Sequence, residues 1–549
     1  MTLGTETYWA TLKQDAGLLL PEVVLVVGMC AVILAPFLGK KSKIVPAVVT
    51  LVTLAAALVT VLLSLSAPGA GAFAFAGMVA VDPFSQFFKL LLMVFSAIVV
   101  VQWLAATRRS EAALDLPDFF CLMLGAATGM ALMASASNLL MIFIATEAAS
   151  IPSYALAGFR KKTKVGSEGA LKYVIFGAAA TAITLYGMSL VYGATGQLSL
   201  SGIAAAAGAG DSGFSPLLAV GLLATFAGIA FKLSAVPMHF WCPDVFQGAP
   251  IAVTTFLSVA SKGAAVCLLV RFLAAFGGVG EGHLGLAIAV GILGGVTATW
   301  GNLAALAQTN IKRLLAYSSI GHSGYMIMAA SLAAVGGGDV GVVAAAVLFY
   351  LVVYVFMNAG AFTVAALLAE QAPAGEDGED IRGYVGLSRR APVLAALLAL
   401  FLLSLFGFPG LGGFIGKIVL GVAMLGAGAG GFVLIAVLLL NTLLSLYFYL
   451  RPVYFMYLAR DERDVPGAAP RTAPFVSVAA LALLAVCAVG VVWTGLLPTL
   501  AQDLAKDHAV LATPVAASQV ALHDAPPDVP TAAHAAAHPA GHDTAAGGR

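Results

Sequence analysis

Five lysines lie inside long apolar stretches of this sequence, where a positive charge is costly: Lys89, Lys172, Lys232, Lys262 and Lys417. A charged lysine in the middle of a membrane helix costs roughly 2.5–3.5 kcal/mol on insertion scales, so each one needs a partner, water or a function. Removal from water disfavours charged lysine, whereas arginine remains protonated. Lysines in such positions can therefore take up and release protons.

A carboxylate and a histidine that also lie in apolar stretches complete the set of residues that could carry protons. Glu147 lies in an apolar run far from other polar sequence, and Lys232 is the cation that we expect beside it. A static ion pair that holds two helices in register is the alternative interpretation. His322 lies among small residues and titrates near neutral pH, which suits a proton relay, although a hydrogen bond between packed helices is also compatible.

Two of the five lysines lie close to the ends of their apolar runs. Lys89 lies near the start of its run and near Asp82, so its side chain can reach the membrane interface, and we expect this structural role. Lys172 follows a group of basic residues at 160–164, and either an interfacial or a proton-carrying role is open for it.

The composition shows which elements must hold these residues. Of the 549 residues, 61% are hydrophobic and 10% are charged, against roughly 25% charged in a soluble domain. The apolar runs have the length of about 20 residues that a helix needs to cross a bilayer. We therefore predict an all-α polytopic membrane protein with about fourteen transmembrane helices. The runs lie near residues 18–38, 44–65, 84–105, 118–135, 138–159, 168–193, 214–239, 249–275, 284–305, 313–334, 340–368, 391–421, 431–458 and 474–497.

Two of these predicted helices are interrupted close to a lysine. Pro237 follows Lys232 in the seventh run, and Pro409 lies in a glycine-rich segment before Lys417 in the twelfth. Broken helices at corresponding positions of two halves are typical of a transport site built from inverted repeats. We expect helices 4–8 and helices 9–13 to form two inverted five-helix repeats, each of which contributes half of a polar pathway.

This pattern divides the chain into five parts. They are residues 1–110 with the first three helices, 111–280 with the first repeat, 281–460 with the second repeat, 461–502 with helix 14, and 503–549 as a disordered tail rich in His, Ala and Pro. Lys and Arg are concentrated in the connections after odd-numbered helices, which predicts that both termini, including the tail, are extracytoplasmic. Metal binding by the tail histidines is an alternative, but their spacing is irregular.

Several functional classes have no support in the sequence. The formal net charge is +1, so nothing points to a nucleic-acid partner. The five cysteines are far apart and form no CxxC pair, which argues against an iron–sulfur or zinc site. No flavin or nucleotide motif is present. We therefore expect neither a cofactor nor a redox site in this chain.

Three segments carry a family resemblance that covers roughly residues 80–460. They are 231–250 (FKLSAVPMHFWCPDVFQGAP), 310–325 (NIKRLLAYSSIGHSGY) and 407–417 (GFPGLGGFIGK). With these segments the chain resembles the proton-translocating, antiporter-like membrane subunits of respiratory complex I, and within them the subunit N group, to which the PDVFQGAP segment is most similar. Cys242 stands where we would expect threonine or leucine more often, and we expect no effect on proton chemistry from it.

The resemblance implies a role for each candidate residue. It implies that Glu147 and Lys232 form the pair of a first half-channel, that Lys262 and His322 form a central connection, and that Lys417 is the exit-side station. Lys172 has looser support as a further relay residue.

The resemblance also implies partners. Protons would move through this chain while quinone is reduced in partner subunits of an NADH:quinone oxidoreductase, which would hold NADH, FMN, iron–sulfur clusters and quinone. The partners would be other membrane subunits of complex I, including further antiporter-like ones, the hydrophilic redox arm, and lipid of a bacterial cell (inner) membrane.

Two other functions remain open at this point. A subunit of a multisubunit cation/proton antiporter or of a membrane-bound hydrogenase would use the same lysines without NADH, and its partner proteins would distinguish it. A non-transporting assembly scaffold would hold the buried charges as static pairs, and charge-neutral replacements would then leave activity intact.

Overall fold

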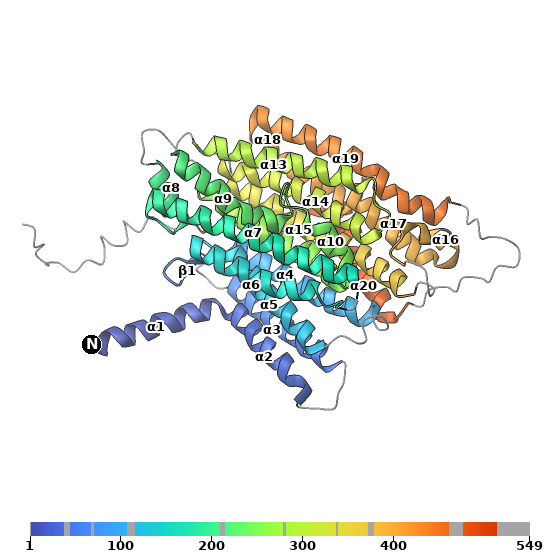
Figure 1. Cartoon of the computed structure of the whole chain (residues 1–549), viewed down its shortest axis with the longest axis horizontal. Helices are drawn as coiled ribbons and strands as arrows, with labels where there is room; N and C mark the ends of the chain where they lie inside the picture. Colours follow the sequence, from blue (N-terminus) through green and yellow to red (C-terminus); the bar gives the residue numbers. More distant parts are fainter. Residues whose placement is uncertain are drawn as a thin grey trace, which may run out of the picture. The chain divides into compact units, whose positions relative to one another are not determined.

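The computed structural model describes residues 2–37, 44–66, 71–106, 116–161, 163–208, 215–277, 282–335, 339–371, 378–459 and 476–512, and helices dominate these residues (Figure 1). The chain divides into two units, Met1–Thr513 and Pro514–Arg549, and the described residues all belong to the first. The predicted domain boundaries near 110, 280 and 460 lie at or beyond the edges of the described ranges, and these divisions remain predictions.

Within the described residues, twelve helical segments are long and apolar enough to cross a membrane. They are α2 (Leu20–Leu34, continued by η1, Ala35–Phe37), α3 (Val45–Ser66), α4 (Pro83–Ala106), α5 (Leu116–Ser135), α6 (Leu139–Ala157), α7 (Lys164–Thr195), α9 (Pro216–Leu233), the continuous segment of α11 (Ile251–Phe256), η2 (Leu257–Ser261) and α12 (Lys262–Ala274), α13 (Gly282–Ala305), α15 (Val340–Glu370), α19 (Gly428–Tyr457) and α20 (Val478–Leu496).

Shorter or more polar elements complete the fold. They are α1 (Thr2–Leu18), α8 (Leu200–Gly208), α10 (Trp241–Gly248), α14 (Ile311–Ala330), η3 (Ser331–Ala334), η4 (Ile381–Tyr384), α16 (Leu387–Arg390), α17 (Pro392–Phe406), α18 (Gly412–Leu425) and α21 (Pro498–Asp507). Every predicted apolar run coincides with a helix or a pair of helices, so the all-helical multi-pass class is confirmed. The count of about fourteen spans and the inverted repeats remain predictions, because α14 is less apolar and α17 and α18 are each short.

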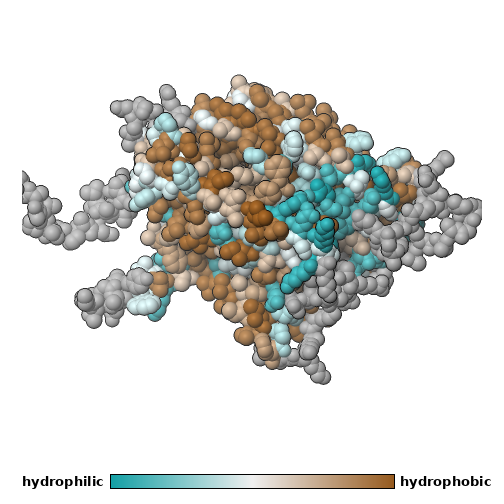
Figure 2. All heavy atoms as spheres, viewed as in Figure 1, coloured by the Kyte–Doolittle hydropathy of each residue, from teal (hydrophilic) through white to brown (hydrophobic). Residues whose placement is uncertain are grey.

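The visible face of the bundle is largely apolar, as expected for a membrane protein (Figure 2). Figure 2 shows hydrophobic side chains over most of the visible face, with hydrophilic residues gathered mainly toward one end. The segment Ile251–Ala274 is different, since it is buried along its whole apolar length. A helix that is apolar on all sides and surrounded by other helices lies in the core of a large bundle. Lys262 therefore lies on a central helix.

A small hairpin that the sequence analysis did not predict precedes α4. β1 (Ala72–Ala74) pairs antiparallel with β2 (Val79–Val81). The turn between them contains Phe75 and Ala76 at φ 52° and 51°, a left-handed conformation that is uncommon outside glycine. The hairpin leads directly into Asp82, the residue immediately before α4 begins at Pro83.

The C-terminal segment corrects one prediction. The predicted disordered tail begins at residue 503, but α21 extends to Asp507 and the residues up to 512 pack on the bundle. The carbonyl of Val510 accepts a hydrogen bond from Phe84 N at 3.3 Å, and Ala512 N donates to Asp82 Oδ2 at 2.9 Å. Residues 513–549, the rest of the predicted tail, lie outside the described residues.

Candidate functional site

The predicted break in the seventh span is confirmed and lies directly beside Lys232. α9 ends at Leu233, and Ser234 follows in a left-handed conformation with φ 55°. Trp241 Nε1 donates to the carbonyl of Phe231 at 3.0 Å, so a backbone group near the helix end is bound by a side chain. The peptide bond before Pro237 is cis. The break therefore places Lys232 in the last turn of a half-helix.

Lys232 and Glu147 are close in the fold but are not in direct contact. Lys232 is 1% exposed, and its Nζ has no hydrogen-bond partner among the residues that the structure describes. The Nζ lies 5.9 Å from the centre of the Tyr154 ring. Glu147 Oε1 instead accepts a hydrogen bond from Thr181 Oγ1 at 2.6 Å. The expected ion pair is therefore absent from the described contacts.

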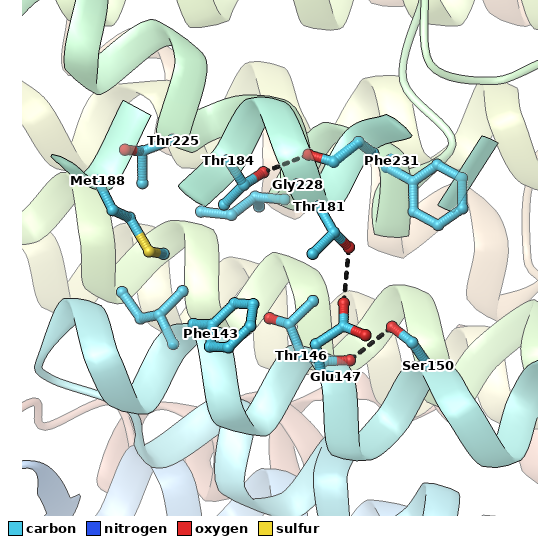
Figure 3. Close-up of a pocket in the computed structure, with 13 residues that line it drawn as sticks. Phe143, Thr146, Glu147, Ser150, Thr181, Thr184, Met188, Thr225, Gly228 and Phe231 are labelled. Atoms are coloured by element: carbon cyan, nitrogen blue, oxygen red, sulfur yellow. Dashed lines mark hydrogen bonds between the residues drawn. The ribbon is translucent and has the colours of Figure 1, made fainter. Parts of the chain in front are cut away.

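Glu147 lines a pocket between α6, α7 and α9 (Figure 3). The pocket lining also includes Phe231, the residue directly before Lys232, so the backbone that leads into Lys232 borders the pocket. The polar lining consists of hydroxyl groups from all three helices. Besides Glu147, the polar residues are Thr146, Ser150, Thr181, Thr184 and Thr225.

Lys262 contacts both sides of the first break. It follows a π-helical turn, Leu257–Ser261, a helix irregularity that is frequent at functional sites. Its Nζ donates to Ser234 Oγ at 3.3 Å and to Cys242 Sγ at 3.7 Å. The Cys242 thiol is therefore one of the polar contacts of the central lysine, and the expectation that Cys242 has no effect on proton chemistry stays an untested prediction.

His322 lies in a buried group of tyrosines that the sequence analysis missed. Its Nδ1 is 2.5 Å from the hydroxyl of Tyr350, and its Nε2 is 3.0 Å from the hydroxyl of Tyr449. Tyr449 also lies 2.5 Å from Ser318 Oγ. No contact joins His322 to Lys262 in the described residues. Hydroxyl-bearing tyrosines inside long apolar runs were the available signal, because a buried hydroxyl needs a partner.

Lys417 lies at the second break and reaches back across it. α17 ends before Gly407, which has φ 94°, and α18 begins at Gly412. Lys417 Nζ donates to the carbonyl of Phe406 at 2.5 Å, and the Tyr325 ring lies 5.3 Å away. The carbonyl end of a helix carries partial negative charge, which favours a cation there. A side chain on residue 407 would crowd this ammonium group, since a Cβ there would be 3.3 Å from Nζ.

Lys172 is not part of the buried group. Its side chain is 39% exposed, and its Nζ lies 2.8 Å from Glu168 Oε1 and 2.7 Å from Asp244 Oδ2. Asp244 also binds Arg313 at 2.7 Å. Burial by itself would raise the pKa of Asp244, but the hydrogen bonds from Lys172 and Arg313 lower it overall. The structure thus places Lys172 in a polar cluster apart from the other candidates.

The prediction that the Lys89 side chain reaches the membrane interface is wrong. It is 0% exposed, and its Nζ forms an ion pair with Glu22 Oε1 at 2.7 Å. Glu22 lies on α2 and Lys89 on α4, so the pair joins two helices of the N-terminal part. Asp82, the neighbour expected for Lys89, is instead bound to Arg271.

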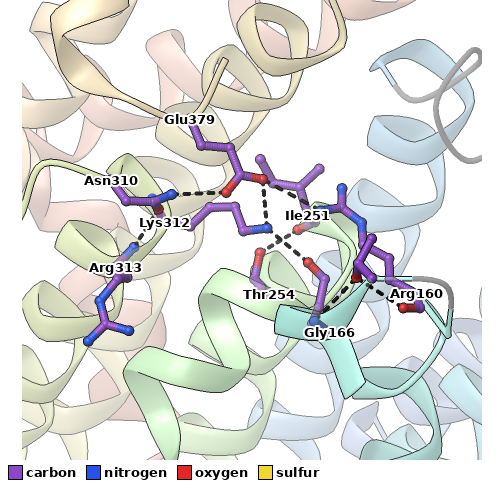
Figure 4. Close-up of polar contacts among 10 residues, drawn as sticks. Arg160, Gly166, Ile251, Thr254, Asn310, Lys312, Arg313 and Glu379 are labelled. Carbon is purple, nitrogen blue, oxygen red and sulfur yellow. Dashed lines mark hydrogen bonds and ion pairs between the residues drawn. The ribbon is translucent and has the colours of Figure 1, made fainter. Parts of the chain in front are cut away.

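A further ionic cluster joins four segments at the start of α14 (Figure 4). Buried Lys312 binds Glu379 Oε1 at 2.9 Å and donates to the carbonyl of Ala249 at 3.0 Å. Asn310 donates to Glu379 Oε2 at 3.1 Å, and Arg160 lies 3.5 Å from Oε1. Burial raises the pKa of Glu379, but Lys312, Asn310 and Arg160 together more than offset this, so the pKa is lowered overall. The cluster holds the backbone around the start of α11.

Comparisons with known proteins agree on one family. The family described as NADH:quinone oxidoreductase/Mrp antiporter, TM, matches residues 136–445. NADH-quinone oxidoreductase subunit N 2 of Sorangium cellulosum is 42% identical over 404 residues, which cover 71% of this chain and 78% of the relative. Subunit N of Anaeromyxobacter sp. (strain Fw109-5) is 38% identical and covers 86% of this chain and 93% of its own length.

Solved structures give the same result. A chain of respiratory complex I from Thermus thermophilus with bound aureothin is 34% identical, with a TM-score of 0.71, over 88% of this chain and 99% of that chain. A chain of the archaeal membrane-bound sulfane sulfur reductase has a TM-score of 0.77 at 22% identity, over 90% of this chain and 97% of that chain. The second likeness shows the fold alone.

Proposed function

The chain belongs to the NADH-quinone oxidoreductase subunit N family, and on this premise we propose that it translocates protons through Glu147, Lys232, Lys262, His322 and Lys417. The partner subunits would carry NADH, FMN, iron–sulfur clusters and quinone, and their redox reaction would drive the protons. The complex would lie in a bacterial inner membrane with both termini of this chain extracytoplasmic and lipid around the bundle.

One observation carries the proposal. Three buried lysines have no carboxylate within ion-pair distance in the described part of the chain, and each lies at a helix irregularity: Lys232 before the first break, Lys262 after the π-helical turn, and Lys417 after the second break. Buried lysines that only hold a fold together have carboxylate partners here, as Lys89 and Lys312 do. A lysine without a fixed counter-ion is free to change its charge.

The geometry supports an order for the stations. Ser234 lies two positions after Lys232 and binds Lys262, so the first break joins these two lysines. Beyond Lys262, the hydroxyls of Tyr350 and Tyr449 flank His322. Tyr325 connects this group to Lys417, because its ring contacts both His322 and the Lys417 ammonium group. Water would complete the steps between groups that are not in contact.

The test begins with the tagged chain extracted in mild detergent. Co-purification of flavin, iron–sulfur proteins and inhibitor-sensitive NADH:quinone activity is expected. Recovery of antiporter-like subunits alone would favour the cation/proton antiporter or membrane-bound hydrogenase alternative.

The second step measures protons moved per electron in proteoliposomes. Lys262→Met and Lys417→Met are expected to abolish most proton translocation while the complex still assembles. The matched control is Lys89→Met combined with Glu22→Gln, which removes a buried lysine together with its carboxylate partner and should pump normally. Unchanged pumping in the Lys262 and Lys417 variants would support the non-transporting scaffold instead.

A further inference from the structure

The proposed pathway has a gap between Lys262 and His322 that no described contact closes. On one side of the gap, Lys262 Nζ donates to Cys242 Sγ at 3.7 Å. On the other side, His322 Nδ1 lies 2.5 Å from the hydroxyl of Tyr350. A proton passes between two groups only when they are within hydrogen-bond reach or are joined by a water. A buried side chain with an exchangeable hydrogen, placed between these two groups, would close the gap.

Tyr354 on α15 is a buried tyrosine whose hydroxyl the fold leaves unsatisfied. It is 0% exposed, and its hydroxyl forms no hydrogen bond of normal geometry within the described residues. The side chains of Asn358 and Ser319 come close enough to interact with this hydroxyl. Ser319 Oγ has already given its hydrogen to the carbonyl of Ala316, and Asn358 Oδ1 accepts none from the described part of the chain. Buried hydroxyls normally have a partner, so an unsatisfied one indicates an ordered water or a function.

The Tyr354 side chain borders the histidine side of the gap. Its ring centre lies 5.2 Å from that of His322. Tyr350, whose hydroxyl contacts His322, precedes Tyr354 by one turn of α15, and the two rings are stacked at 6.3 Å with 16° between their planes. Ser319, which lies near the Tyr354 hydroxyl, precedes His322 by one turn of α14. The hydroxyl of Tyr354 therefore lies beside the helix turn that carries the histidine.

The same helix face of α15 also borders the lysine side of the gap. Leu351 precedes Tyr354 by three positions, so the two side chains share a face. A Cβ on Gly263, the residue after Lys262, would lie 3.5 Å from Leu351 Cδ2, which is ordinary van der Waals contact. Cys242, whose thiol contacts Lys262, is among the groups that interact electrostatically with the Tyr354 hydroxyl. This face of α15 thus packs against the part of α12 that holds the central lysine.

We propose that Tyr354 is a further relay residue whose hydroxyl carries protons between Lys262 and His322. The proposal rests on the proposed function, because it adds a step to the same pathway. A hydroxyl has one hydrogen and two lone pairs. Its oxygen accepts a proton from the Lys262 side and releases its own hydrogen toward His322, so an N–H bond of the ammonium group breaks, one forms on the imidazole, and the tyrosine stays neutral. The hydroxyl then rotates back, which a fixed hydrogen bond would hinder.

The test is Tyr354→Phe in the whole complex, a change that removes the hydroxyl and keeps the ring. Proton translocation in proteoliposomes should fall by about tenfold, the effect of losing one hydrogen bond to a charged group. The thermal lifetime of the purified complex should be unchanged or longer, because the lost hydroxyl was buried without a hydrogen bond.

Tyr173→Phe is the matched control. Tyr173 is also 0% exposed, and its hydroxyl is also unsatisfied among the described residues. Its ring packs between Tyr154 and Trp241, at 4.7 and 4.2 Å, and has no contact with His322 in the described part of the chain. Its translocation should remain within about twofold of the unmodified complex.

The two measurements together decide the role of the hydroxyl. Slower translocation in Tyr354→Phe with an unshortened lifetime would support the relay. Translocation equal to that of Tyr173→Phe would overturn it. A complex that fails to assemble, or a slower rate together with a shortened lifetime, would also overturn it, because the hydroxyl would then hold the structure. Failure of the proposed function has a separate signature, in which Lys262→Met and Lys417→Met leave pumping unchanged.

Discussion

Replacing Asp82 with asparagine is expected to destabilise the bundle by removing one charge of a buried pair. Arg271 Nη1 lies 2.8 Å from Asp82 Oδ2 and Nη2 lies 2.8 Å from Oδ1, a two-pronged contact. Arg271 Nε also donates to the carbonyl of Ala134 at 3.0 Å, while Ser85 N and Ala512 N donate to the carboxylate at 2.9 Å each. The pair thereby ties α4, α5, α12 and the C-terminal segment together.

The magnitude follows from burial. The side chains of Arg271 and Asp82 are 5% and 0% exposed, so asparagine would leave a guanidinium charge inside the protein without compensation. Breaking a buried pair in this way costs about 3–5 kcal/mol. Removing both charges, with Asp82→Asn and Arg271→Met together, should recover most of that loss because no unpaired charge then remains.

The assay is the lifetime of the detergent-purified complex at a fixed raised temperature, because membrane complexes of this size usually unfold irreversibly. If most of the loss appears in the unfolding rate, Asp82→Asn should shorten the lifetime by about a hundredfold or more. Glu168→Gln is the control, since it removes a pair that is 39% and 55% exposed and should cost at most about 1 kcal/mol. If Asp82→Asn were as stable as this control, the reasoning would be refuted. The same holds if the double variant Asp82→Asn, Arg271→Met were no more stable than Asp82→Asn alone.

The pH dependence of this contribution has a definite sign. Burial raises the pKa of Asp82, but Arg271 and the other donors outweigh burial, so the pKa lies below its ordinary value of 3.8. A carboxyl whose pKa is lowered by folding stabilises the folded state above its unfolded pKa, and this stabilisation is lost as the pH falls through the folded pKa. The difference between Asp82→Asn and the unmodified complex should therefore be the same throughout neutral pH.

Three further outcomes are expected. Cys242→Ala removes a contact of Lys262 and should reduce proton translocation by about two- to fivefold, whereas Cys242→Ser should retain most of the translocation rate. Equal rates for the two variants would show that the thiol only fills space. Tyr449→Phe removes a hydroxyl partner of His322 and should reduce translocation by about tenfold while the complex still assembles, as judged by co-purified flavin. Glu379→Gln should shorten the thermal lifetime by an amount that is constant from about pH 8 to about pH 6, because the lowered pKa of Glu379 keeps its carboxylate charged over that range. An effect that disappears near neutral pH would show that the Glu379 carboxylate is not charged there.

The sequence alone determined the elements and the chemistry of the candidate residues. Long apolar runs require helices in a bilayer, where the backbone has no other partner, and this predicted the helices of the bundle from residue 18 onward. The prolines at 237 and 409 marked the two breaks, because a proline in a helix interior removes a backbone hydrogen bond and tends to kink or end the helix. The cost of a charge in hydrocarbon singled out the lysines before any contact was known.

Only the tertiary structure decided which side chains meet. Lys89 looked interfacial because of its place in its run, but it faces Glu22 on another helix. Arg271 and Asp82 are 189 positions apart and lie in contact. These pairings depend on how each helix is rotated about its axis, and a run that is apolar on all sides, as in Ile251–Ala274, contains no periodicity from which that rotation follows.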